Sequence, residues 1–242
     1  MKPLRIIHLF PELLNLYGDG GNVIVLEKRC EWRGIPVEVK AFGMGDDVDL
    51  SGADIVFLGG GTDREQRIVC DELLRHQAEL KAYVDDGGVL LAVCGGYQLL
   101  GHHYMMDGEM VQGLGLVDLE TVRGEGRLIG NAAIESPLFD MPVIGFENHG
   151  GRTRLGEGVE PLGKTLAGTH GNNGEDGTEG VHFRNVIGTY LHGPLLPKNP
   201  QVADWLIARA LERRGESPDL LTELDDAVEL EANRVMRKRL GL

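Results

Sequence analysis

The chain has 242 residues, with 24 Lys and Arg against 38 Asp and Glu, for a net charge of −14. At roughly 100–200 residues per domain, this is one large domain or one domain with an appendage. So acidic a chain does not favour a nucleic-acid or anionic-membrane surface. No apolar run reaches the roughly 18 residues that a membrane span needs, so no span is expected.

The three cysteines indicate neither a disulfide framework nor a structural zinc site. They form no CxxC pair and do not cluster with histidines at metal-ligand spacing. We therefore expect no metal, and a reducing, cytoplasmic setting.

Short apolar runs alternate with helix-period stretches in the first hundred residues, which is typical of βαβ units. Strands are predicted at Leu4–Leu9, Val37–Phe42, Ile55–Leu58 and Val89–Val93. A helix capped by Asn22 is expected over residues 22–33. Thr62 and Glu65 have the spacing of a capping box, and they open one helix that ends at Gly87-Gly88. Its apolar stripe is expected to comprise Ile68, Val69, Leu73, Leu80 and Val84. This pattern predicts an α/β fold with a mostly parallel sheet covered on both faces.

The second half is richer in short strands and glycine turns. A hairpin turning at Asp107-Gly108 is expected, followed by strands over 116–122, 127–135, 141–147 and 186–191. Residues 168–180 are polar and glycine-rich and are predicted to form an exposed loop. One helix should run from Asn199-Pro200 to about Arg214, and Ser217-Pro218 should open a second that ends in the basic turn 234–239. We divide the chain into a domain over 1–200 and a C-terminal helical extension over 201–242, packed on that domain.

Cys94 is the sharpest chemical signal. It stands between an apolar strand and a helix start, flanked by Ala92 and Gly96, the small residues that a tight nucleophile elbow requires. The helix N-terminus is expected to lower its thiol pKa. A buried cysteine packing as a small hydrophobe is the alternative. Cys30 and Cys70 lack such flanks and are interpreted as structural.

A glycine triplet, Gly59–Gly61, follows the predicted third strand. Ligands bind at the carboxyl ends of strands in open α/β sheets, and glycines let backbone N–H groups approach a developing negative charge. With the N–H of Gly95, this loop is a candidate oxyanion hole, although a triplet alone is also typical of a simple tight turn. The GK[ST] ending of a phosphate-binding P-loop is absent.

A cysteine nucleophile needs a base, and the chain has eight histidines. His192 follows a predicted strand and precedes a Gly-Pro turn, a position suited to the carboxyl edge of the sheet. Periodicity alone does not distinguish it from a structural histidine.

Taken together, LGGGTD, AVCGGYQLLG, GFENHGGRT and GTYLHGPLLPKNP resemble the motifs of class I (triad-type) glutamine amidotransferases, cobyric-acid-synthase-like branch. With LFPELLNLYGDGGN at the start, the set looks most like the glutaminase subunits of lipid II isoglutaminyl synthases. The similarity covers nearly the whole chain. The resemblance implies a flavodoxin-like fold, and it implies that L-glutamine is the substrate.

The resemblance also assigns roles. Cys94 would attack the glutamine side-chain amide, His192 would shuttle the proton, and the N–H groups of Gly60 and Gly95 would hold the oxyanion. Substrate contacts would come from Arg127, which suits the α-carboxylate, and from Gln98, Asn148, His149 and Gly150. An ordinary solvated arginine is the alternative for Arg127.

One position departs from the class pattern. Class I members usually carry an acid two residues after the histidine, where this chain has Pro194. The cobyric-acid-like branch also lacks that acid. Glu12, Asp19 or Glu147 are candidates to orient His192, and so is a carboxylate from another chain, which we prefer.

The resemblance implies that the chain is one subunit of a two-subunit enzyme. No cofactor is expected in this chain, and the absence of an ATP-binding loop leaves acceptor activation to a partner. The resemblance implies a heterodimer with a Mur-ligase-like synthetase that uses ATP and magnesium. The partner would amidate the D-glutamate of lipid II to D-isoglutamine in peptidoglycan synthesis, a step in cell-wall biogenesis and cell shape.

Other functions remain open at this point. They are an amidotransferase for a corrinoid precursor, a non-catalytic binding protein of the same fold, and a cysteine peptidase or chaperone of related fold.

Overall fold

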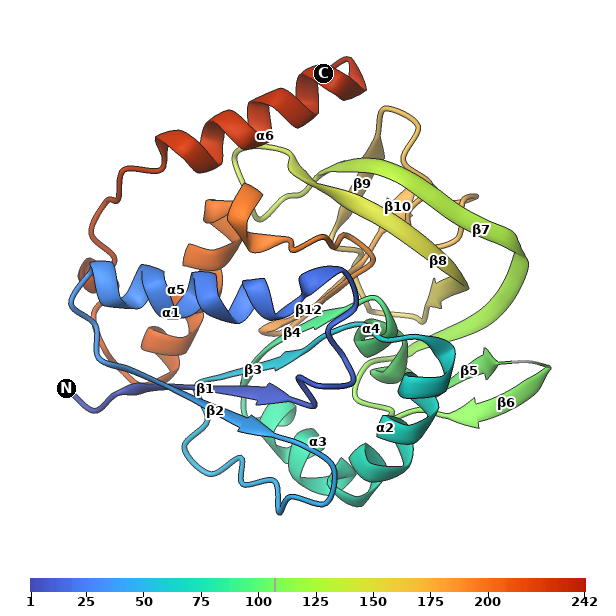
Figure 1. Cartoon of the computed structure of the whole chain (residues 1–242), viewed down its shortest axis with the longest axis horizontal. Coiled ribbons are helices and arrows are strands. Elements are labelled where there is room, and N and C mark those ends of the chain that lie inside the picture. The colour runs from blue at the N-terminus through green and yellow to red at the C-terminus, as the bar shows by residue number, and fades with distance from the viewer. Residues whose placement is uncertain (107) are drawn as a thin grey trace.

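A six-stranded, mostly parallel sheet carries the fold, in the order β11-β12-β4-β3-β1-β2 (Figure 1). The computed structural model describes residues 1–106 and 108–242, so the predicted turn residue Asp107 lies outside the described residues. The strands of this sheet are β1 (Leu4–Leu9), β2 (Val37–Phe42), β3 (Ile55–Leu58), β4 (Val89–Val93), β11 (Val181–Phe183) and β12 (Val186–Thr189). All neighbours pair in parallel except β11 with β12. The four strands predicted in the first hundred residues are confirmed.

Helices cover both faces of this sheet, which explains why β3 and β4 are apolar and buried at every position. Helices α1 (Gly20–Trp32) and α5 (Pro200–Arg213) pack together on one face. Helices α2 (Asp63–Arg75), α3 (Gln77–Asp85) and the short α4 (Gly95–Leu99) lie on the other side (Figure 1). The capping box of Thr62 and Glu65 is present as predicted.

Two helix predictions were wrong in detail. The helix expected from Thr62 to Gly87 is divided into α2 and α3, because His76 leaves helical geometry at φ −104° and ψ 12°. Ile68 is exposed, since the buried stripe of α2 runs through Val69, Cys70 and Leu73 and places Ile68 to one side.

Asn22 is not the cap of α1 but lies inside it. Its side chain accepts from Leu196 N–H at 2.9 Å and donates to the Asp19 carbonyl at 3.0 Å, which ties α1 to the segment before α5. The side chain of Asn15 serves the helix start instead, accepting from Gly20 N–H at 2.8 Å.

A second sheet stands beside the first, in the order β10-β9-β7-β5-β6, with β8 paired to β7. Its strands are β5 (His103–Met106), β6 (Glu109–Gln112), β7 (Leu119–Glu135), β8 (Val143–Leu155), β9 (Gly163–Leu166) and β10 (Thr178–Glu179). The strands predicted over 116–122 and 127–135 are one long strand, β7. Its pairing with β8 shifts register between Arg123 and Leu128.

The prediction of an exposed loop over residues 168–180 was wrong in part: residues 174–177 are exposed, but most of the segment is not. Asn172 and Glu179 are fully buried there, and Asn173 nearly so. The segment satisfies its own polar groups: Asn172 Oδ1 accepts from Gly180 N–H at 2.9 Å, and Asn173 Oδ1 accepts from Glu175 N–H at 2.9 Å. The polar composition of the segment therefore reflects an internal hydrogen-bond network as well as an exposed tip at residues 174–177.

The C-terminal segment differs from prediction after α5. Ser217-Pro218 opens only the 3₁₀ turn η3 (Pro218–Leu220), and the last helix, α6, runs over Ala227–Leu240. Helix α6 packs on β7 and β8 (Figure 1). Buried Arg29 of α1 pairs with Asp204 of α5 at 2.7 Å and with Asp226 before α6 at 2.5 Å.

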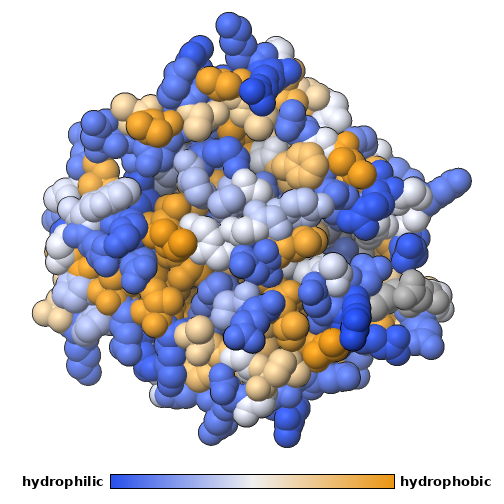
Figure 2. All heavy atoms as spheres, viewed as in Figure 1, coloured by the Kyte–Doolittle hydropathy of each residue, from blue (hydrophilic) through white to orange (hydrophobic). Residues whose placement is uncertain are grey.

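The surface agrees with the acidic composition. Hydrophilic residues predominate on the face shown in Figure 2 and are interrupted by apolar patches. Across residues 1–106 and 108–242, no helix has the length and apolar character needed to cross a membrane.

Glu179→Gln tests the buried segment. Burial raises the pKa of Glu179 from 4.5 to about 8, so the folded chain keeps a proton that the unfolded chain releases between those pH values. The free energy of unfolding of the wild type, relative to Glu179→Gln, should fall by about 1.4 kcal/mol per pH unit from pH 5 to 8. Urea denaturation at several pH values measures this.

The exposed Glu175→Gln is the matched control: it removes a carboxylate from the surface of the same segment, keeps Glu179, and should retain the fall in stability between pH 5 and 8. Parallel pH profiles for the wild type and Glu179→Gln would contradict a buried, protonated Glu179.

Candidate active site

Cys94 occupies a strained elbow between β4 and α4. Its backbone has φ 52° and ψ −108°, a conformation that costs a non-glycine residue about 1–3 kcal/mol. Hydrogen bonds to both neighbouring strands hold it: Cys94 N–H donates to the Thr189 carbonyl at 2.8 Å, and Gly96 N–H donates to the Gly59 carbonyl at 3.1 Å. The geometry is that of the predicted elbow.

The small residue after the elbow is a steric requirement. A Cβ on Gly96 would lie 2.6 Å from the Leu58 carbonyl oxygen and 2.7 Å from that of Gly59. Such contacts with backbone atoms cannot be relieved by a rotamer change, which explains the glycine at this position.

Gly60 lies against Cys94 at the end of β3. A Cβ on Gly60 would be 3.0 Å from Cys94 Cβ and 3.3 Å from Asp19 Oδ2. Its N–H group, predicted to hold the oxyanion, donates at 2.8 Å to the Asp19 carboxylate. The oxyanion role of Gly60 and Gly95 stays a prediction, and in this structure the Gly60 donor is already engaged.

A cavity of about 500 Å³ opens at the elbow. Five of the predicted site residues line it together: Cys94, Gln98, Arg127, His149 and Gly150. Cys94 follows β4, Gln98 lies in α4, and the other three lie in β7 and β8, so the second sheet supplies one wall of the cavity and the first sheet supplies Cys94. The other four predicted site residues, His192, Asn148, Gly60 and Gly95, do not line it.

Arg127 stands beside the register shift in β7, a type of irregularity that redirects side chains near functional sites. Its Nε donates to Asn148 Oδ1 at 2.7 Å, and an Nη donates to the Asn148 carbonyl at 2.6 Å. Asn148 Nδ2 donates in turn to Tyr17 Oη at 2.6 Å. Asn148 thus positions Arg127 and links it to the turn that carries Tyr17.

His192 is fully buried behind Tyr17 and Phe146. The ring centroids of Tyr17 and His192 are 4.5 Å apart, and those of Phe146 and His192 are 5.9 Å apart. Neither ring nitrogen of His192 makes a hydrogen bond with any described residue, so Cys94 is not hydrogen-bonded to it. Burial, followed by the charges of Arg127 and Lys198, lowers its pKa to about 4, which keeps the imidazole neutral and opposes its protonation in this arrangement.

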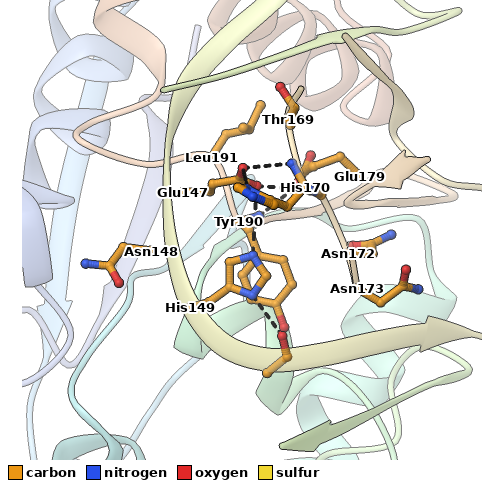
Figure 3. Close-up of polar contacts among 12 residues, drawn as sticks. Glu147, Asn148, His149, Thr169, His170, Asn172, Asn173, Glu179, Tyr190 and Leu191 are labelled. Atoms are coloured by element: carbon orange, nitrogen blue, oxygen red, sulfur yellow. Dashed lines mark hydrogen bonds and ion pairs between the residues drawn. The ribbon is translucent and has the colours of Figure 1, made fainter. Parts of the chain in front are cut away.

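The acids proposed to orient His192 are placed elsewhere. Glu12 is exposed, and Asp19 binds Gly60. Glu147 is buried and accepts from His170 Nδ1 at 2.7 Å and from Gly171 N–H at 2.9 Å (Figure 3). Across residues 1–106 and 108–242, no carboxylate is hydrogen-bonded to His192.

His149 belongs to a packed polar layer under the cavity. Its ring stacks on Tyr190 at 3.6 Å, while the preceding Asn148 points to the opposite side of β8 (Figure 3). Tyr190 Oη accepts from Gln98 Nε2 at 3.1 Å, and Gln98 Oε1 accepts from Gln66 Nε2 at 2.9 Å. Burial lowers the pKa of His149 to about 3, so this ring is a neutral wall of the cavity.

Electrostatics keep Cys94 protonated in this arrangement. Burial, assisted by the negative charge of Asp19, raises the pKa of its thiol to about 12. A hydrogen bond from the Gly95 N–H group at the start of α4 lowers the pKa of the thiol, but burial raises it by more. The predicted lowering of this pKa by the helix N-terminus was therefore wrong, because desolvation dominates.

Sequence reasoning missed Tyr17, Gln66 and Tyr190 and gave Asp19 a different role. Asp19 and Tyr17 stand in a Tyr-Gly-Asp-Gly turn after β1, so their place at the carboxyl edge of the sheet was the available signal. In the described part of the chain, no group of three or more His, Cys, Asp or Glu residues is arranged to hold a metal ion.

A family model for the CobB/CobQ-like glutamine amidotransferase domain matches residues 5–200. The chain belongs to this family. It is 43% identical over 240 residues to the lipid II isoglutaminyl synthase (glutamine-hydrolyzing) subunit GatD of Staphylococcus aureus strain N315, covering 99% of this chain and 97% of that protein. The GatD subunit of Streptococcus pneumoniae strain R6 is 42% identical over 213 residues, covering 87% and 82%.

Solved structures agree on the fold. A glutamine amidotransferase structure from Thermotoga maritima superposes with a TM-score of 0.56 at 14% identity, covering 99% of this chain and 96% of the other. The predicted flavodoxin-like α/β class is thereby confirmed. The division at residue 200 stays a prediction.

Alkylation of this glutamine amidotransferase tests the state of the thiol. With its pKa near 12, Cys94 should react with iodoacetamide at pH 8 about 100-fold more slowly in the folded chain than in urea. Peptide mass spectrometry resolves Cys94 from Cys30 and Cys70. Equal rates in the folded and unfolded chains would contradict the buried, protonated thiol.

Proposed function

We propose that this chain is the glutamine-hydrolysing subunit of a lipid II isoglutaminyl synthase. The observation that carries the proposal is the shared cavity of Cys94 and Arg127, because a nucleophile and a carboxylate-binding cation are what hydrolysis of glutamine requires. The similarity to GatD subunits over nearly the whole chain supports the same reading.

Glutamine binds with its α-carboxylate on Arg127, whose planar guanidinium matches that group. Asn148 holds the guanidinium in place, and Gln98 and Gly150 line the path between the two ends of the substrate. The stacked pair of His149 and Tyr190 forms a rigid wall.

Cys94 then attacks the side-chain amide carbon. The thiol proton passes to neutral His192, and the N–H groups of Gly60 and Gly95 hold the oxyanion of the tetrahedral intermediate. His192 returns the proton to the departing nitrogen, which leaves as ammonia, and a γ-glutamyl thioester remains on Cys94. Water hydrolyses the thioester to glutamate and restores the thiol.

The ammonia is consumed by a partner in a heterodimer that acts in the cytoplasm. That partner is a Mur-ligase-like synthetase that binds ATP and magnesium, activates the α-carboxylate of D-glutamate in lipid II, and forms D-isoglutamine. We also place the acid that orients His192 on this partner, since Asp19 and Glu147 are engaged within the chain. Such an arrangement suppresses wasteful hydrolysis by the free subunit.

Cys94→Ala should abolish glutamate release from glutamine by the complex without loss of folding, because no other thiol lines the cavity in the described residues. Coupled glutamate assay and thermal melting measure the two effects. Cys70→Ala, which removes a buried thiol from α2, is the matched control and should retain hydrolysis. Hydrolysis by Cys94→Ala at the wild-type rate would refute the nucleophile.

Arg127→Ala should raise KM for glutamine about 10- to 100-fold, the loss expected for a charge-assisted bidentate contact, with a smaller effect on kcat. Steady-state kinetics of the complex separate the two constants. Arg154→Ala, which removes an exposed arginine of β8, is the matched control and should leave KM unchanged. An unchanged KM in Arg127→Ala would exclude it from the glutamine site.

The acceptor is tested by reconstitution. The purified chain with the Mur-ligase-like protein of the same organism should convert lipid II, glutamine and ATP to amidated lipid II. Amidation of a corrinoid precursor in place of lipid II would favour the corrinoid alternative, and absence of both products and of a complex would favour a non-catalytic role.

A further inference from the structure

The N-cap residue of α1 does not serve its own helix. An aspartate at this position usually accepts from the N–H groups of the first helical turn. Asp19 makes no such bond, and Asn15 accepts from Gly20 N–H instead. The Asp19 carboxylate reaches across the fold to Gly60, 41 residues away in the sequence. Its function therefore lies at the active site.

The contact engages the group that the reaction needs. Gly60 N–H donates to Asp19 Oδ2 at 2.8 Å, and Gly60 is wedged between Asp19 and Cys94. One N–H group cannot fully serve both the Asp19 carboxyl group and a reaction oxyanion. Burial raises the pKa of Asp19 to about 7, and above that pH its negative charge opposes an oxyanion at Gly60. Asp19 is fully buried, and its Oδ1 has no hydrogen-bond partner among the described residues. Only one of the two oxygens of the buried Asp19 carboxyl group is therefore hydrogen-bonded to a described residue.

The same short turn also covers the base. Tyr17, two residues before Asp19, packs its ring on His192 and accepts from Asn148. Leu16 N–H donates to the Gly60 carbonyl at 2.8 Å. Tyr17 and Gly18 both have left-handed backbones, at φ 61° and φ 78°. One turn, η1 (Leu16–Gly18) with Asp19, therefore contacts the predicted oxyanion donor, the predicted base and the side chain that holds Arg127.

We propose that residues 16–19 form a latch in which Asp19 occupies the oxyanion donor of Gly60 and Tyr17 covers His192, so that the turn must move before glutamine is hydrolysed. This proposal rests on the proposed function. Asp19 acts here as a positioning residue that controls the availability of Gly60, and it contacts neither the amide nor the α-carboxylate of the substrate.

Two substitutions of Asp19 separate the effect of its hydrogen bond with Gly60 from the effect of its negative charge. Asp19→Ala removes both the acceptor and the negative charge. It should raise kcat for glutamine hydrolysis by the isolated chain about 10- to 100-fold, in line with the value of one oxyanion donor, with KM little changed. Asp19→Asn keeps an oxygen acceptor for Gly60 and should raise kcat by a much smaller factor. Both variants should speed Cys94 alkylation at pH 8, because both remove the charge that opposes the thiolate.

Asp46→Ala is the matched control. Asp46 also accepts a backbone N–H, from Gly43 at 2.7 Å, but in an exposed turn outside the cavity. Its removal should alter neither kcat nor alkylation. The amide resonance of Gly60 in ¹⁵N spectra should shift strongly in Asp19→Ala and weakly in Asp19→Asn, which reports the hydrogen bond without any turnover.

The outcomes are distinct. If folded Asp19→Ala releases the Gly60 amide but hydrolyses glutamine no faster than the wild type, or more slowly, the carboxylate supports the site and the latch is refuted. Equal gains in kcat for Asp19→Ala and Asp19→Asn would assign the effect to charge alone and would also refute it. If the wild-type complex with its synthetase partner hydrolyses no glutamine, the proposed function itself fails.

Discussion

The close approach of two parallel strands at their carboxyl ends controls this active site. Gly60 and Cys94 lie side by side, so that a Cβ on Gly60 would be 3.0 Å from Cys94 Cβ, and Cys94 is held in a left-handed backbone that its own preferences oppose. Two backbone hydrogen bonds, one toward β12 and one toward β3, stabilise the elbow. The rigid sheet therefore supplies the strain energy that projects a cysteine into the cavity.

The second sheet supplies the remaining side chains of the candidate site. The long pair of β7 and β8 brings Arg127 and His149 to the cavity and holds Asn148 against Arg127, and the register shift in β7 stands next to Arg127. The cavity is thus lined from both sheets, with Cys94 from the first and Arg127 and His149 from the second. Their relative placement depends on a packed polar layer in which Tyr190 of the first sheet's carboxyl edge meets His149 of the second.

Local signals predicted the first half well. The apolar runs gave strand bounds that match, and Thr62 with Glu65 marked the start of α2, because strand hydrophobicity and capping act over a few residues. Five of the predicted site residues meet on one cavity. The burial of Asn172 and Glu179 and the contact of Asp19 with Gly60 were not predictable, since both depend on partners distant in sequence. The protonated state of Cys94 was missed for the same reason: burial is a property of the assembled fold.

The ion pairs of Arg29 have a consequence for the last forty residues. Its guanidinium is almost fully buried in α1, roughly two and a half to three turns beyond Asp19, and the carboxylates that pair with it belong to α5 and to the segment before α6. Removal of both acids would leave an uncompensated cation in the interior, which costs several kcal/mol. Asp204 and Asp226, which lie beyond the 5–200 match of the family model, therefore neutralise the charge of Arg29 in α1. The helix that starts at the active site thus depends on carboxylates from the C-terminal end of the chain for its charge balance.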